Sequence, residues 1–80
     1  MFWSRIKIFG IRLKLENAQR KSVRLYRDRE DWRARAKDER IQPEDRDICE
    51  SAVADIDRQR EELEEYIREL DQKLRPLRAT

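Results

Sequence analysis

The sequence has no histidine, one cysteine and one glycine in 80 residues. A single cysteine excludes a disulfide within the chain, and without histidine the usual ligands of a zinc site are missing. One glycine cannot form the glycine-rich loop that holds phosphate groups. These absences predict a protein with no metal site, no cofactor, no small-molecule substrate and no catalytic residues, and we expect it not to be an enzyme.

Long apolar runs are also missing. No uncharged run exceeds four residues, whereas a membrane-spanning helix needs about 20 apolar residues. The same shortage excludes the apolar core of a secretory signal. With one thiol and no such signal, we expect a cytoplasmic protein.

Charge is what the chain has in abundance. Charged residues make up 48% of the sequence and hydrophobic residues 38%. This balance is typical of long solvated helices and is too polar for a compact globule. A chain of this length forms one domain at most, and its two prolines and single glycine leave few places to turn.

Pro43 marks the predicted turn. Proline disfavours helix at the residue before it and is well accepted in the first turn of a new helix. Glu44 and Asp45 suit the positive end of that helix, and Pro76 predicts its far end. The chain, residues 1–80, is therefore expected to be a single helical hairpin with helices at about residues 3–40 and 43–75 and a turn at about residues 41–43.

Both predicted helices carry residues at alternating spacings of three and four, the pattern of a packing seam. In the first helix, the predicted seam is Ile8, Ile11, Leu15, Ala18, Ser22, Leu25, Arg29, Trp32 and Ala36. In the second, it is Cys49, Ile56, Leu63, Leu70 and Leu77, with Ala52, Gln59, Tyr66 and Lys73 between them. A tight turn pairs residues whose numbers sum to about 84 or 85, so large residues face small ones. The chain is thus predicted to be all-α, a two-helix antiparallel coiled-coil hairpin that dimerises into a helical bundle.

The net charge of +2 hides an uneven distribution. Residues 1–29 hold nine bases and two acids, whereas residues 30–80 hold eleven bases and sixteen acids. Either the two halves pair with each other or the basic half meets an acidic partner. In the predicted register, internal pairing would join Lys21 to Glu64, Arg24 to Glu61 and Lys14 to Asp71.

The stretch MFWSRIKIFGIRLKL is apolar on two sides when it is placed on a helix. One side belongs to the seam, and the other holds Phe2, Trp3, Ile6, Phe9 and Leu13. The second helix of a hairpin covers only one side, and an apolar face left over marks an interaction site. We predict that these five residues bind a partner: a second copy, another protein, or an anionic membrane surface. The predicted function is that of a small non-enzymatic regulatory or adaptor protein that binds a protein, itself or another, through this face.

Residues 5–15 carry signals of two different secondary structures. Residues 11–15 alternate strictly between apolar and basic, which is a strand signal. Gly10 also weakens a helix by about 1 kcal/mol. Helical and extended conformations of residues 5–15 both stay open at this point.

The run from Arg20 to Arg35 is the candidate for nucleic-acid binding. Its arginines suit phosphates, and Tyr26 and Trp32 suit base stacking, although acids interrupt the run and Trp32 has seam spacing. An RNA-binding hairpin dimer is therefore the alternative function. Its predicted nucleic-acid contacts are Arg20, Lys21, Arg24 and Arg27.

The residues Asp47-Ile48-Cys49-Glu50-Ser51 resemble the start of the second helix in Rop, the repressor-of-primer family of plasmid regulators. The resemblance implies a hairpin that dimerises into a four-helix bundle and binds paired RNA loops, with Cys49 in the bundle core. The family's RNA contacts come from its first helix, and no residue of this first helix matches them. The resemblance therefore assigns no RNA-binding residue here.

Overall fold

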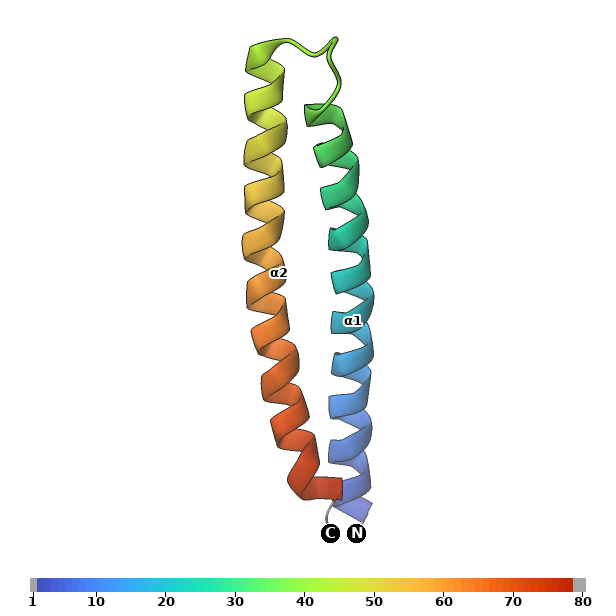
Figure 1. Ribbon diagram of the computed structural model, residues 1–80. Coiled ribbons are helices and arrows are strands. Elements are labelled where there is room, and N and C mark those ends of the chain that lie inside the picture. The colour runs from blue at the N-terminus through green and yellow to red at the C-terminus, as the bar shows by residue number, and fades with distance from the viewer. Residues whose placement is uncertain (1, 79–80) are drawn as a thin grey trace.

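The computed structural model describes residues 2–78 as two helices joined by a short loop (Figure 1). Helix α1 spans Phe2–Ala36 and helix α2 spans Pro43–Arg78. The helices lie side by side and antiparallel in a rod of 60 × 15 × 13 Å. The predicted all-α hairpin is confirmed, and the described residues contain no strand.

Helix α1 ends earlier than predicted, at Ala36 rather than near residue 40. Asp38 is the cause. Its carboxylate Oδ1 accepts a hydrogen bond from the backbone N–H of Arg40 at 3.0 Å, and its carbonyl accepts one from the N–H of Ile41 at 3.2 Å. An aspartate that binds nearby backbone in this way competes with the helix and favours a turn. The connection therefore occupies residues 37–42, not 41–43 as predicted.

Helix α2 begins at Pro43 and continues through Pro76 to Arg78, past the predicted end near residue 75. At its start, the backbone N–H of Arg46 donates to the carbonyl of Gln42 at 2.9 Å and closes the first turn. At its far end, proline lacks an N–H and its ring crowds the preceding turn. In Figure 1 the last turn of α2 bends toward α1. Pro76 therefore bends the helix without ending it.

The predicted seam of α1 lies against α2 along its whole length. Every predicted position from Ile8 to Ala36 is buried or half-buried, and Ala18 and Leu25 are 5% and 9% exposed. Residues 5–15 are helical, so the extended alternative is wrong. Gly10 sits inside α1, and a Cβ at this position would meet nothing within 4 Å.

One of the two residue rows predicted for the seam of α2 is confirmed, and the other is mostly wrong. The row Cys49, Ile56, Leu63, Leu70 and Leu77 is buried or half-buried, but the residues predicted between them are not all in the seam. Ala52 is half-buried, whereas Gln59, Tyr66 and Lys73 are exposed. The positions one residue further along contact α1 instead, namely Val53, Arg60, Ile67 and Leu74.

Side-chain chemistry explains this difference in α2. Residues three and four positions after a seam residue both lie near the seam, so spacing alone does not choose between them. Leu74 buries more apolar surface than Lys73 would, and apolar burial is the main stabilising term. Leu74 is accordingly the most buried large side chain, at 1% exposed, while Tyr66 remains 42% exposed.

Candidate binding surface

The predicted partner-binding residues lie on the outer side of α1, away from α2. Their steps of three and four along the chain put them opposite the seam. We call them the N-terminal patch: Phe2 is 71% exposed, Trp3 74%, Ile6 46%, Phe9 68% and Leu13 49%. The rings of Phe2 and Trp3 meet edge to face, with centroids 6.1 Å apart. Large apolar side chains exposed together are characteristic of an interaction site.

Bases surround the N-terminal patch. Residues 2–15 and 72–78 together contain no acid. The two segments lie at the same end of the hairpin, where the start of α1 and the last turn of α2 lie side by side in Figure 1. The first turn of α1 also has no acid to offset the positive end of the helix. The bases in these segments are Arg5, Lys7, Arg12, Lys14, Lys73, Arg75 and Arg78.

The outer side of α1 continues beyond the patch as a basic row. Helical spacing carries the side that holds Leu13 on to Arg20, Arg24 and Arg27, with Lys21 on its flank. All four bases are exposed, and they are the residues predicted to contact nucleic acid. Arg20 is held by Glu16, with Nη2 and Oε1 2.7 Å apart. The patch and the basic row therefore share one face of the molecule.

This basic row does not pair with α2. Among residues 2–78, the predicted ion pairs Lys21–Glu64, Arg24–Glu61 and Lys14–Asp71 do not form. Asp71 binds Arg75 of its own helix instead, at 3.1 Å. The outer faces of α1 and α2 point in opposite directions, so Arg24 cannot reach across the hairpin to Glu61. Internal pairing does not account for the basic half of the chain.

The outer face of α2 has the opposite chemistry. It presents exposed carboxylates, interrupted by Arg58 and Arg68. Arg58 is bound to Asp55 at 3.1 Å, within its own helix. The outer side of α1 is therefore mainly basic as far as Arg27, where Asp28 and Asp31 follow, and the outer side of α2 is mainly acidic. The exposed acids of α2 are Glu44, Asp45, Asp47, Glu50, Asp55, Glu61, Glu62, Glu64, Glu65 and Glu69.

Within the described part of the chain, one ion pair joins the two helices. Arg29 Nε donates a hydrogen bond to Asp57 Oδ1 at 2.6 Å, and this hydrogen bond raises the pKa of Arg29 above its ordinary value. One turn away, the guanidinium of Arg60 lies 5.3 Å from the ring centre of Tyr26. These contacts lie on one flank of the seam and are structural. Sequence spacing placed Arg29 in the seam but did not reveal its partner.

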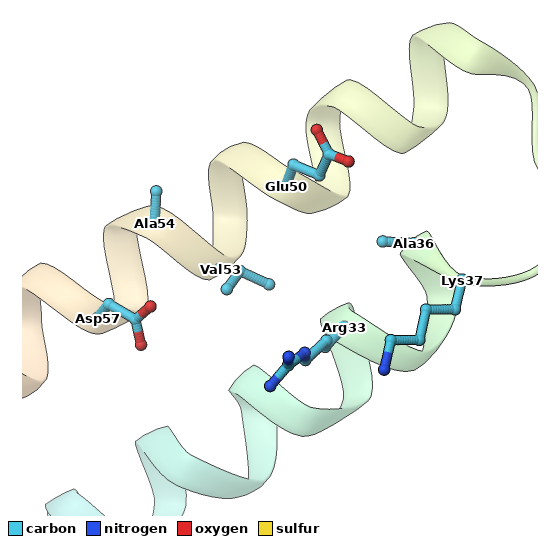
Figure 2. Close-up of a pocket in the computed structure, with 7 residues that line it drawn as sticks. All are labelled: Arg33, Ala36, Lys37, Glu50, Val53, Ala54 and Asp57. Carbon is cyan, nitrogen blue, oxygen red and sulfur yellow. The ribbon is translucent and has the colours of Figure 1, made fainter.

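A shallow groove of about 410 Å³ lies near the loop end of the hairpin. Figure 2 shows Arg33 and Lys37 on one side of it and Glu50 and Asp57 on the other, with Val53 between them. Asp57 already accepts the hydrogen bond from Arg29. The full lining is Arg33, Ala36, Lys37, Glu50, Val53, Ala54 and Asp57, which includes no hydroxyl, thiol or imidazole that could act as a nucleophile.

Over residues 2–78, no group of three metal-ligating side chains gathers in one place. Neither described helix has a stretch long and apolar enough to cross a membrane.

Comparison with protein-family models, with curated proteins and with solved structures finds no match to this chain. The resemblance of residues 47–51 to Rop therefore stays a prediction. Cys49 lies in the seam and is 4% exposed, as the spacing of the seam predicted.

Proposed function

We propose that the protein is a non-enzymatic regulatory or adaptor module that works by binding through the N-terminal patch. The supporting observation is that five large apolar side chains, Trp3 and Phe9 prominent among them, lie on the side of α1 that α2 cannot reach. Burying such side chains contributes about 25 cal/mol for each Å² removed from water. Aromatic residues in the centre of an interface carry much of the binding energy.

A second copy of the chain is a poor occupant of this patch. Two patches packed together would bring two sets of bases into contact, and like charges in an interface cost several kcal/mol. If the hairpin dimerises, we propose that it uses a different side, near the loop end. There, Trp32, Ile48 and Ala52 line a shallow groove, and Ile48 is 61% exposed. The N-terminal patch then stays available for another partner.

Site-specific crosslinking in cells tests the proposed function. A photoreactive benzoyl-phenylalanine would replace Phe9 in the patch, and in a matched protein it would replace Arg58, whose side chain is 69% exposed on α2. We expect adducts from the Phe9 position well above those from the Arg58 position. Equal yields from the two positions would contradict a role for the patch. The chemical nature of the adduct (protein, RNA or lipid) identifies the class of partner.

A further inference from the structure

We propose that the N-terminal patch binds an anionic lipid surface, and that the hairpin lies on this surface with the outer face of α1 toward it. This inference rests on the proposed function, because it names the partner of the same patch. It departs from the protein partner that the sequence favours. The reason is how the fold distributes charge around the patch and along α1.

The end of the hairpin has the composition of a segment that rests in a lipid headgroup layer. Such segments combine tryptophan and phenylalanine on an apolar side with lysine and arginine around it. Here Trp3 and Phe9 are 74% and 68% exposed. Residues 2–15 and 72–78, which lie together at this end, contribute seven bases and no acid, and one of these bases, Arg75, binds Asp71 in the preceding turn. Apolar side chains can therefore enter the layer while the surrounding bases meet its phosphates.

The basic row extends the same contact along α1. Arg20, Arg24 and Arg27 follow Leu13 on the same outer side, and Arg24 and Arg27 have no ion-pair partner among residues 2–78. From Phe2 to Arg27 this face is about 40 Å long at 1.5 Å per residue. With this face down, the acids on the outer face of α2 point away from the lipid. In this orientation the basic row of α1 faces the anionic headgroups, and the acids of α2 avoid repulsion from them.

Other classes of partner fit this face less well. A nucleic acid would neutralise the basic row but would leave the five apolar side chains of the patch against phosphates. A protein would need a groove that is apolar at one end and acidic along the rest of the 40 Å or so. An anionic bilayer offers both an apolar interior and negative charge at every point of its surface.

Vesicle sedimentation with the full chain tests the proposal. We expect binding to vesicles of phosphatidylcholine mixed with phosphatidylserine, little binding to phosphatidylcholine alone, and weaker binding as salt is added. Each base near an anionic leaflet strengthens partitioning roughly fivefold, so Arg24→Gln with Arg27→Gln should weaken it roughly 25-fold. Trp3→Ala with Phe9→Ala should weaken it at least about tenfold.

Matched variants on other faces serve as controls. Tyr66→Ala removes an exposed apolar side chain away from both the patch and the groove at Ile48, and Arg58→Gln with Arg68→Gln removes two bases from the outer face of α2. Both proteins should bind vesicles as the parent does. Circular dichroism should show that every variant keeps its helix content, because all of the substituted residues are exposed.

Tryptophan fluorescence tests the orientation. In a Trp32→Phe variant the remaining Trp3 should shift to shorter wavelength when anionic vesicles are added, because it leaves water. In a Trp3→Phe variant the remaining Trp32, in the seam near the loop end, should not shift. A shift of both tryptophans, or of neither, would overturn the proposed orientation.

The outcomes separate this inference from the proposed function. Equal binding to neutral and anionic vesicles would overturn the lipid proposal. So would the absence of vesicle binding together with protein or RNA adducts at the Phe9 position, and that result would leave the binding role of the patch intact. No vesicle binding and no adducts above the Arg58 control would overturn both.

Discussion

Arg29 Nε on α1 lies 2.6 Å from Asp57 Oδ1 on α2, and this hydrogen bond joins the two helices in the half of the hairpin nearer the loop. The side chain of Arg29 is 21% exposed and that of Asp57 is 43% exposed, so water reaches the acid more easily than the base. The pair lies one position away from the register expected from the sequence. A polar contact of this kind at a seam position favours one register of the two helices over registers that are shifted along the helix axis.

Removing this pair should lower the melting temperature of the hairpin. We expect Arg29→Met to destabilise it more than Arg20→Met, because Arg20 binds Glu16 on the surface of a single helix and exposed pairs contribute little. Thermal circular dichroism of the two variants measures the difference. Equal losses would show that the pair between the helices adds nothing beyond an ordinary surface contact.

The row of α2 residues that contacts α1 gives a second prediction. Leu74→Ala should lower the free energy of unfolding by about 2–5 kcal/mol, because it leaves a cavity at a fully buried site. Lys73→Ala, one residue away and exposed, should change it by less than about 0.5 kcal/mol. Urea denaturation measures both. If Leu74→Ala unfolds the protein outright, Ile67→Val should still cost about 0.5–1.5 kcal/mol. A larger effect at Lys73 than at Leu74 would contradict the seam.

Gly10 offers a stabilising substitution. Nothing lies within 4 Å of a Cβ at this position, so Gly10→Ala should raise the free energy of unfolding by about 0.5–1 kcal/mol through its effect on the helix. The reverse change at an exposed helical site, Ala54→Gly, should lower it by a similar amount. Denaturant titrations of the two variants give the comparison. A loss of stability in Gly10→Ala would mean that this part of α1 is not a regular helix in solution.

Stability should depend little on pH near neutrality. The pKa of Arg29 is raised by its hydrogen bond to Asp57. Its contribution is therefore complete below the pKa of the unfolded state and is lost only as the pH rises through the folded pKa, in strongly alkaline solution. The chain has no histidine, so we expect a constant melting temperature from about pH 5.5 to about pH 7. A transition in melting temperature within this range would contradict the prediction.

The architecture followed from patterns that act over the whole chain. Repeated three-four spacing and a single strong break at Pro43 predicted two antiparallel helices, and every seam residue of α1 was placed correctly. Local chemistry caused the misses. Asp38 binds its neighbouring backbone and ends α1 early, and Pro76 is tolerated within the last turn of α2. The recurrence of Ile67 and Leu74 at a spacing of seven was the signal that would have corrected the seam of α2.

The sequence predicted the exposure of the candidate surface but not the arrangement of charge around it. Apolar residues opposite the seam predicted the exposure of the N-terminal patch, since two helices have no third element to cover it. Charge pairing was predicted wrongly, because residues opposite in number, such as Arg24 and Glu61, can lie on outer faces that point apart. The basic field around the patch depends on α2 returning Lys73, Arg75 and Arg78 to the start of α1. That closeness exists only in the folded hairpin.

The separation of charge between the outer faces of α1 and α2 gives the molecule a large transverse dipole moment in spite of a net charge of only +2. Near a charged surface, such a dipole experiences a torque as well as a force, so the hairpin turns about its long axis before contact. On a cation exchanger the basic outer face of α1 would contact the resin, and on an anion exchanger the acidic outer face of α2 would do so. Retention on either resin would therefore depend on which side of the rod faces the matrix, and the isoelectric point would be a poor guide to its chromatography.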